Sequence, residues 1–391
     1  MEKINKKIKS THILIAGEVL SSNLGDQVIA EMLKYLLLGY DENLVVNFLD
    51  ISNRYPGLTK NKTNNPNPRK KNIPSFIKRF INLFRWLVNY QKNYQYLEGI
   101  LGKADKIFIG GGQLLMDNHW DFPLKLYGIT RLANKLGKEY HIVSCGVGKN
   151  WSLFAKLLVR RILAKSKSIS VRDSQSKLFL MNHFFEKEII LSADPALWIS
   201  SKMPLKKEDK KGIVGFGVID LESANSKNNK KYKEQDILEF WLDLSREFLT
   251  KKIEFEFFCN GSENDFLFMR KIVRHVNQNL GSSIKFNKKP TSINELVEII
   301  NKFDLLISSR LHSHIISASY NIPSIALSWD KKVDAFFGDI NQSQNVFTGF
   351  ERKNIQIIIN LIRSNKFSFD TTIIERKKML VFSNLEKLLT Q

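Results

Sequence analysis

The residues best suited to chemistry lie at positions 309–314, which read Ser-Arg-Leu-His-Ser-His. Arg310 carries a permanent positive charge and can hold a carboxylate or a phosphate through two parallel hydrogen bonds. His312 can accept and return a proton near neutral pH. We therefore predict that Arg310 and His312 are catalytic, with Ser309 and Leu311 in the same donor-binding turn.

The flanking segments predict where this turn lies in the fold. Residues 304–308 form a short apolar run typical of a buried strand, and residues 311–320 have the spacing of a helix. Free N–H groups at the start of a helix attract anions, so a turn from strand to helix suits an anionic substrate. His314 lies two positions beyond His312, and it serves either the chemistry or the structure of the turn.

A second polar turn follows the first predicted strand and contains Asn23, Gly25 and Asp26. Gly25 permits a tight turn, and Asp26 can accept hydrogen bonds from the start of the next helix. These residues are therefore either a capped turn or contacts to a substrate. We carry all three as candidates for substrate binding.

Three consecutive glycines, Gly110, Gly111 and Gly112, follow another predicted strand and precede Gln113. Glycines in succession let the backbone come close to a ligand. The run is not a phosphate loop, because the Gly-Lys-Ser/Thr ending is missing. The four residues are candidates for substrate binding on the strength of their position.

Arg172 stands at the end of a further predicted strand and is followed by Asp173. A guanidinium at a strand end can meet a phosphate or a carboxylate through two hydrogen bonds. The alternative is a structural ion pair between Arg172 and Asp173. We predict Arg172 as a second cationic contact for an anionic donor.

The elements that must hold these residues alternate between strands and helices. This order predicts an α/β protein with mostly parallel sheets. The pattern restarts after the charged segment 203–211, which predicts a Rossmann-like domain at 1–202, a linker at 203–211, a second Rossmann-like domain at 212–365 and a helical tail at 366–391. A length of 391 residues suits two such domains facing a central cleft.

The formal net charge of +21 indicates a polyanionic surface or substrate. A basic insertion, residues 54–97, contains no acidic residue. Its first half, 55–74, is rich in proline and predicts a loop, whereas 76–97 has the period of an amphipathic helix. That helix either packs with a solvated basic face or attaches to an anionic membrane. No motif indicates nucleic-acid binding.

Other sequence features restrict the class of protein. No segment approaches the roughly 20 apolar residues that span a bilayer, and the start of the chain does not resemble a signal peptide. We expect a cytoplasmic protein, with peripheral attachment at the inner face of the membrane as an alternative. Cys145 and Cys259 stand far apart in apolar segments and predict reduced core residues. The histidines do not cluster with other ligand residues, so no metal site is expected.

Taken in order, these motifs resemble those of the polysaccharide pyruvyl transferase family. The resemblance implies a GT-B-type fold and transfer of a pyruvyl group from phosphoenolpyruvate to hydroxyls of a surface polysaccharide or its lipid-linked precursor. It implies that Arg310, Leu311 and His312 form the donor-binding motif, with no cofactor besides the donor substrate and with a sugar or lipid-linked glycan as acceptor. The matching stretches are residues 23–26, 109–112, 170–173, 194–196, 309–314 and 328–333.

Two departures from the family pattern bear on the choice of donor and acceptor. The family often has a Gly-x-Gly-Pro stretch where this chain has Cys-Gly-Val-Gly-Lys at 145–149, and an arginine common in the family is absent from 215–220. A nucleotide-sugar-dependent glycosyltransferase of GT-B fold is therefore one alternative function. A non-catalytic glycan- or anion-binding member of the fold is another.

Overall fold

The computed structural model describes residues 10–52, 54, 74–184, 187–205, 212–226, 232–364 and 370–390. Residues 55–73 of the predicted loop, 206–211 of the predicted linker and 366–369 of the predicted tail lie outside the described residues. Contacts divide the chain into two compact units. Unit 1 holds the described residues up to Leu20, residues 30–193 and those from Leu380 onward, and unit 2 holds residues 21–29 and 194–379.

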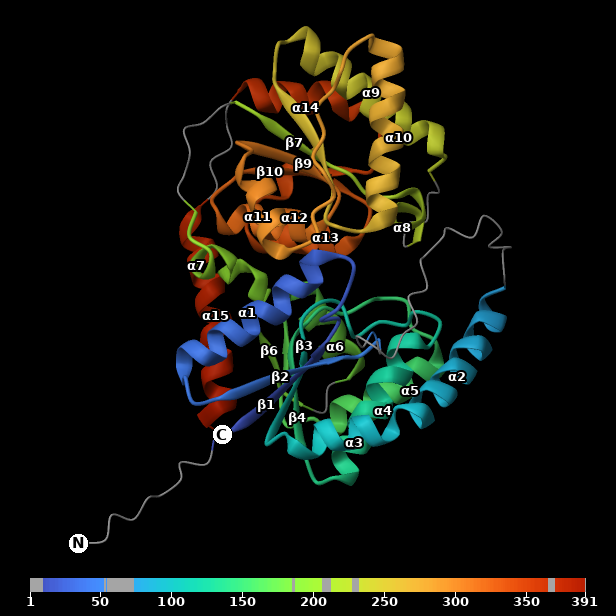
Figure 1. Ribbon diagram of the computed structural model, residues 1–391, viewed down its shortest axis with the longest axis vertical. Coiled ribbons are helices and arrows are strands. Elements are labelled where there is room, and N and C mark those ends of the chain that lie inside the picture. Colours follow the sequence, from blue (N-terminus) through green and yellow to red (C-terminus); the bar gives the residue numbers. More distant parts are fainter. Residues whose placement is uncertain are drawn as a thin grey trace, which may run out of the picture. The chain divides into compact units, whose positions relative to one another are not determined.

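Unit 1 is built on a six-stranded sheet in the order β2-β1-β3-β4-β5-β6 (Figure 1). All neighbouring strands pair in parallel. Since β2 and β3 lie on opposite sides of β1, the strand order reverses between β1 and β3, a point where α/β sheets bind ligands. The strands are β1 (His12–Gly17), β2 (Val45–Asp50), β3 (Lys106–Gly110), β4 (Glu139–Cys145), β5 (Ile169–Val171) and β6 (Ile189–Leu191).

Helices supply the connections between these strands. Buried side chains of α3, α4 and α5 pack on alternate residues of the sheet, such as Leu14, Ile107 and Ile142, because alternate residues of a strand point to the same face. The helices are α1 (Leu24–Tyr40), whose first residues belong to unit 2, α2 (Ser75–Lys92), α3 (Tyr94–Lys103), α4 (Asp121–Lys135), α5 (Leu153–Lys165) and α6 (Ser174–His183).

Unit 2 repeats the plan with a five-stranded parallel sheet in the order β11-β10-β9-β7-β8. Its order reverses between β7 and β9, so the loops after these two strands meet at the same edge of the sheet. The strands are β7 (Val214–Gly217), β8 (Phe255–Phe258), β9 (Leu305–Ser308), β10 (Ser324–Ser328) and β11 (Val346–Thr348). Phe286 adds only an isolated parallel bridge to Phe257 of β8.

Helices precede, connect and follow the strands of unit 2. They are η1 (Pro195–Trp198), α7 (Ile199–Lys202), α8 (Leu221–Ser226), α9 (Glu234–Thr250), α10 (Glu263–Leu280), α11 (Ile293–Asn301), α12 (Leu311–Ser319), α13 (Lys331–Asp339), η2 (Ser343–Asn345), α14 (Asn354–Arg363) and α15 (Thr371–Thr390), which continues into unit 1. No helix in the described part of the chain has the length and apolar character needed to cross a membrane.

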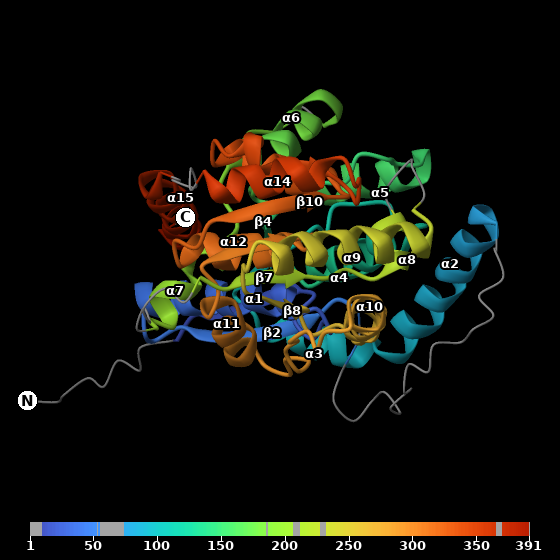
Figure 2. The ribbon, with the colours of Figure 1, turned by 90° about the horizontal axis from the view of Figure 1, so that it is seen from above.

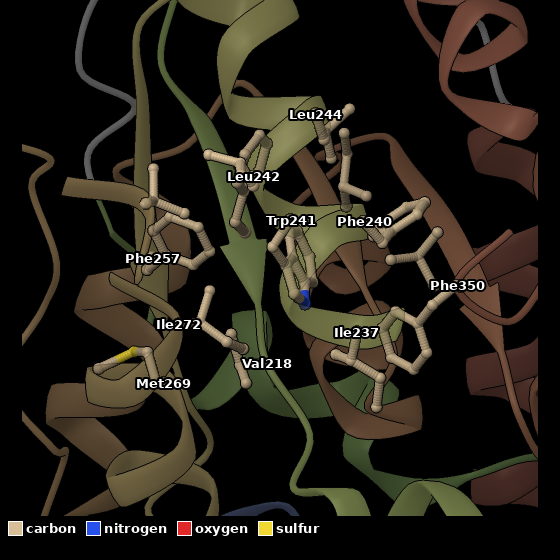
Figure 3. Close-up of a cluster of buried hydrophobic side chains, with 14 of the residues drawn as sticks. Val218, Ile237, Phe240, Trp241, Leu242, Leu244, Phe257, Met269, Ile272 and Phe350 are labelled. Carbon is tan, nitrogen blue, oxygen red and sulfur yellow. The ribbon is translucent and has the colours of Figure 1, made fainter. Parts of the chain in front are cut away.

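Large aromatic rings form the core of unit 2 (Figure 3). Trp241 of α9 meets Phe257 of β8 edge to face at 5.5 Å between ring centroids, and Phe240 meets Phe350 in the same way at 5.6 Å. Such edge-to-face pairs add about 0.5–1.5 kcal/mol beyond the area they bury. This packing fixes β7 and β8, and with them the start of the loops that follow.

Candidate active site

His312 lies in the first turn of α12, between two carboxylates of unit 2. Its Nδ1 is 3.7 Å from Oδ1 of Asp26, and its Nε2 is 3.9 Å from Oδ2 of Asp194. The imidazole is almost fully buried. At these separations the groups interact through charge rather than through hydrogen bonds, so either carboxylate can stabilise a protonated ring.

Both carboxylates are anchored by groups of their own loops. Oδ2 of Asp26 accepts hydrogen bonds from the Ser21 hydroxyl and from Nδ2 of Asn23, each at 3.2 Å. Oδ1 of Asp194 accepts from the N–H of Ala196 at 3.0 Å, which caps η1. In each case the other oxygen of the carboxylate is the one closer to His312, so these bonds keep both carboxylates directed at the ring.

Gly25 allows the start of α1 to approach His312. A Cβ at this position would lie only 2.3 to 2.5 Å from the Cβ and ring atoms of His312, which is closer than atoms can pack. The N–H of the adjacent Leu24 donates to the Asn260 carbonyl at 3.1 Å and holds the turn on unit 2. The structure therefore gives Gly25 a steric role beside His312 and gives Asn23 the role of orienting Asp26.

Arg310 forms a bidentate ion pair with Asp265, the third residue of α10. Its Nε donates to Oδ2 at 2.8 Å and its Nη2 donates to Oδ1 at 2.5 Å, while Asp220 lies 3.5 Å from Nη2. Burial disfavours the cation, but Asp265 and Asp220 favour it more strongly, so the pKa of Arg310 lies above its ordinary value. One edge of the guanidinium is therefore occupied, and Nη1 has no hydrogen-bond partner among the described residues.

His314 is held by two hydrogen bonds inside unit 2. Its Nε2 is 3.0 Å from the Ser308 carbonyl and its Nδ1 is 3.0 Å from the Ser324 hydroxyl. A carbonyl only accepts, so Nε2 carries the proton and Nδ1 accepts from Ser324. Burial lowers the pKa of His314 to about 4, against the effect of the Ser308 carbonyl. His314 is thus a neutral residue that ties α12 to β9 and β10.

Oγ of Ser309 and Nδ2 of Asn260 are buried near this turn and have no hydrogen-bond partner among the described residues. Ser309 is fixed by the indole N–H of Trp329, which donates to its carbonyl at 2.7 Å. The other side-chain atom of Asn260, Oδ1, accepts from the Ser313 hydroxyl at 2.8 Å. An unpaired buried polar atom costs about 1–3 kcal/mol, and such atoms collect where a substrate or water completes the bonding.

A second group of predicted residues gathers in unit 1, at the carboxyl ends of β3, β4 and β5. The carbonyl of Gly112 accepts from the N–H of Gly146 at 2.8 Å, and a Cβ on Gly146 would lie about 3 Å from the guanidinium of Arg172. Gly111 and Gly112 have φ angles of 75° and 82°, which favour glycine. The structure thus brings the glycine run and Arg172 to the same edge of this sheet.

The neighbours of this group account for the other sequence candidates in unit 1. Asp173 lies 3.9 Å from Nε of Arg172 and also caps α6 by accepting from the Ser176 N–H at 2.7 Å. Nε2 of Gln113 donates to the Val147 carbonyl at 3.3 Å. Cys145 and Cys259 are both buried free thiols, as predicted, and burial raises the pKa of each to about 12.

The chain matches the family model of the polysaccharide pyruvyl transferases over residues 23–331, which include both groups of candidate residues. It belongs to that family. The match makes the protein a transferase of polysaccharide biosynthesis. No curated protein sequence matches the chain.

Solved structures are similar to the chain in fold. A UDP-GlcNAc 2-epimerase from Methanocaldococcus jannaschii, in complex with UDP-GlcNAc and UDP, aligns with a TM-score of 0.57 at 11% identity, over 97% of this chain and 99% of the other. The UDP-GlcNAc 2-epimerase from Neisseria meningitidis, bound to UDP-GlcNAc, aligns with a TM-score of 0.55 at 12% identity, over 98% and 100%. At such identities the likeness concerns the fold alone, and it confirms the predicted GT-B-like α/β class.

Three aspartates of the site were not among the predicted site residues. Asp194 was noted only as part of a family motif, and Asp220 and Asp265 were not singled out. Asp194 and Asp220 lie in the loops that follow β6 and β7, so their strand-end position is a signal that could have identified them, whereas Asp265 lies inside α10 and carries no such signal. In the described residues no cluster of three or more histidine, cysteine or acidic side chains is arranged to hold a metal ion.

Proposed function

We propose that this protein transfers a pyruvyl group from phosphoenolpyruvate to hydroxyls of a sugar acceptor. Besides membership of the family, one structural observation supports this proposal. His312 lies between the anchored carboxylates of Asp26 and Asp194, next to Arg310 and at the start of α12. A buried imidazole with paired carboxylates suits a step in which protons move to and from carbon and oxygen.

The donor requires cationic and N–H contacts for its carboxylate and its phosphate. The first N–H groups of α12 have no partner within the helix and attract anions. Arg310 offers Nη1, since Asp265 holds the opposite edge of its guanidinium. Four aspartates make this group of residues acidic in sum, so a second cation is needed, and Arg172 remains our proposed second contact. Gly110, Gly111, Gly112 and Gln113 remain proposed substrate contacts.

The reaction proceeds by addition and then loss of phosphate. A sugar hydroxyl oxygen forms a bond to the enol carbon, its proton passes to a base, and a proton is added to the methylene carbon, which becomes a methyl group. As phosphate leaves the tetrahedral intermediate, the oxygen of a second sugar hydroxyl bonds to the same carbon and closes the ketal, and the proton of that hydroxyl passes to a base. His312 is the group that we propose to transfer these protons, and such a group typically contributes about 10²–10⁴-fold to the rate.

Asp26 and Asp194 act in this scheme as positioning residues. Each lies near one ring nitrogen of His312, so together their charges stabilise the imidazolium that forms when the ring takes a proton. The bonds from Asn23, Ser21 and the Ala196 N–H keep the carboxylates in place before the substrate binds. A preorganised pair of this kind does not have to reorganise during the reaction.

Thermal unfolding in the presence of candidate donors tests the proposal. A ligand that binds the folded state raises its stability in proportion to the logarithm of ligand concentration over Kd. We expect phosphoenolpyruvate to raise Tm progressively, and Arg310→Lys to weaken this effect because lysine cannot reproduce the bidentate pair with Asp265. Arg270→Lys, at an exposed position of α10, is the matched control and should leave the effect unchanged.

Other patterns of ligand-dependent Tm would support one of the two alternative functions instead. A Tm raised by UDP-GlcNAc and unaffected by phosphoenolpyruvate would favour the nucleotide-sugar-dependent glycosyltransferase. A Tm raised by phosphoenolpyruvate, with no phosphate released from it in the presence of any glycan acceptor, would favour a binding protein without catalysis.

A further inference from the structure

Helix α2 turns its apolar side to the solvent. Along the described residues of this helix no side chain is buried. Phe76, Phe80 and Phe84 are 60%, 62% and 69% exposed, and Leu87 and Val88 are close to half exposed. At 100° per residue these side chains cover one continuous sector of the helix. The sequence favoured either a packing helix with a solvated basic face or a membrane contact, and in the structure the apolar row is largely exposed, with only the edge of Phe80 against Trp120.

The opposite side of α2 is the side that packs, and it fixes the orientation of the helix. Nδ2 of Asn82 donates to the His119 carbonyl at 2.9 Å. Trp86 and Tyr90 stack on each other at 5.4 Å between centroids, and a Cβ on Gly128 of α4 would lie 3.0 to 3.1 Å from these two rings. Since Gly128 leaves room for the rings, α2 cannot turn its apolar row inward without losing this contact. Figures 1 and 2 both show α2 along the outer side of α4.

Positive charge runs along one edge of the apolar row. Lys78, Arg85 and Lys92 recur at a spacing of seven residues, which keeps them on one side of the helix. Helix α2 contains no acidic residue. An outward apolar sector bordered by cations is the arrangement of helices that lie in the headgroup region of anionic membranes.

Helix α5, which packs on α4 as α2 does, has an exposed side of the same character. Its exposed side carries Leu153, which is 85% exposed, and Leu157 one turn later. The exposed positions beside them are the basic residues Arg160 and Arg161. A chain of rings links the two helices, from Phe80 to Trp120 at 6.2 Å and from Trp120 to Phe154 at 4.6 Å. Tryptophan is favoured at membrane interfaces because its ring is apolar and its N–H is polar.

We propose that this surface, formed by the exposed sides of α2 and α5, binds the headgroup region of a bilayer that contains anionic lipid. A contiguous apolar patch on a folded protein marks an interaction site. A second copy of the chain is a poor occupant, because a symmetric contact would bring identical rows of cations together. An anionic bilayer satisfies both the apolar side chains and the cations. The proposal concerns binding alone and is independent of the donor and the chemistry.

Flotation of the full-length protein with lipid vesicles tests this proposal. Vesicles of equal parts phosphatidylglycerol and phosphatidylcholine are compared with vesicles of phosphatidylcholine alone. We expect the protein to float with the anionic vesicles and at least tenfold less with the neutral ones, and we expect added salt to reduce binding because surface charges are screened.

Two pairs of variants separate the apolar and the basic contributions. Phe76→Ser with Phe84→Ser should weaken binding about tenfold or more, whereas Leu178→Ser with Met181→Ser, exposed apolar residues of α6 in the same unit, should not. Arg85→Glu with Lys92→Glu should weaken it more than tenfold, since each cation near an anionic surface contributes about fivefold. Arg270→Glu with Arg274→Glu on α10 changes the net charge equally and should have a smaller effect.

Three outcomes would overturn the proposal. The first is equal binding of the protein to anionic and neutral vesicles. The second is undiminished vesicle binding by the two α2 variants. The third is a loss of vesicle binding in the control variants as large as the loss in the α2 variants. Self-association that disappears in Phe76→Ser with Phe84→Ser, without any vesicle binding, would instead assign the surface to a second copy. All substituted residues are exposed, so unchanged Tm values will show that the variants remain folded.

Discussion

The two groups of candidate site residues, one in each unit, differ in the chemical groups they contain. In unit 2, Asp26, Asp194, Asp220 and Asp265 surround one arginine and one histidine within a few ångströms. In unit 1, the group consists of the buried glycine run 110–112 and Gly146, with the buried Arg172 packed against Gly146. The first group is dense in titratable side chains, and the second combines glycine backbone with a single cation.

Because the two groups differ in chemistry, we expect them to have different roles in the reaction. Carboxylates around an imidazole control where a proton lies, whereas glycines and an arginine let an anion approach N–H groups closely. We therefore expect substitutions in unit 2 to affect the rate of the chemical step, and substitutions at the edge of unit 1 to affect affinity for an anionic substrate.

The largest effect is expected at His312. His312→Gln keeps the volume of the ring approximately but removes the titratable group, so kcat should fall by about 10²–10⁴-fold. Arg172→Lys in unit 1 should mainly raise KM for the donor. His275→Gln, on α10, is the control for a histidine outside the site. Steady-state kinetics of phosphate release measures all three variants. An unchanged kcat in His312→Gln would contradict the claim that the unit 2 group controls the chemical step.

Asp265→Ala should cause the largest loss of stability. It removes the bidentate buried partner of Arg310 and leaves only Asp220, at 3.5 Å from Nη2, beside the guanidinium; breaking a buried ion pair in this way typically costs about 3–5 kcal/mol. Urea unfolding measures the change. The double variant Asp265→Leu with Arg310→Met should recover much of the stability and none of the activity. If it remained as unstable as Asp265→Ala, the buried charge would not be the cause.

His314 should make the protein sensitive to acid. Its pKa is about 4 in the folded protein and 6.5 when exposed. Because the folded state resists protonation, this contribution to stability is complete above pH 6.5 and is lost as the pH falls towards 4, by about 3 kcal/mol in all. Unfolding free energies across this range should decline less steeply in His314→Gln. His141, whose pKa burial also lowers to about 4, adds to the decline in both proteins.

Asp194→Asn is expected to have the smallest effect of the four. The amide keeps the volume and can still cap η1 through its oxygen, but it no longer stabilises a proton on Nε2 of His312. We expect kcat to fall by about tenfold, which corresponds to about 1.4 kcal/mol, and the pH profile of kcat to shift. A changed Tm with an unchanged pH profile would mean that Asp194 is only a structural residue.

The sequence predicted the alternation of elements and the strand-to-helix turn well, because both depend on local patterns. The strand before Ser309 and the helix after Arg310 begin and end within a residue or two of the prediction. The partners of Arg310 and His312 could not be predicted in the same way. Asp265 and Asp26 come from distant segments, and only the reversal of strand order between β7 and β9 and the packing of Gly25 bring them to the site.

The sequence pattern could not predict the orientation of α2 either. The periodicity identified an amphipathic helix, but it does not reveal which side of the helix meets the protein. That choice depends on Gly128 of α4, which leaves space for Trp86 and Tyr90 and so directs the phenylalanines outward. A single glycine on a neighbouring helix thus decides the exposure of a whole apolar row.

The most direct test of the central claim is a mass measurement of the product. The full-length protein is incubated with phosphoenolpyruvate and a panel of synthetic and lipid-linked glycans, with His312→Gln in parallel. We predict that a glycan gains the mass of a pyruvyl group with release of an equal amount of phosphate, and that His312→Gln forms at most a small fraction of this product. A panel left unmodified by phosphoenolpyruvate but glycosylated from a nucleotide sugar would contradict the account.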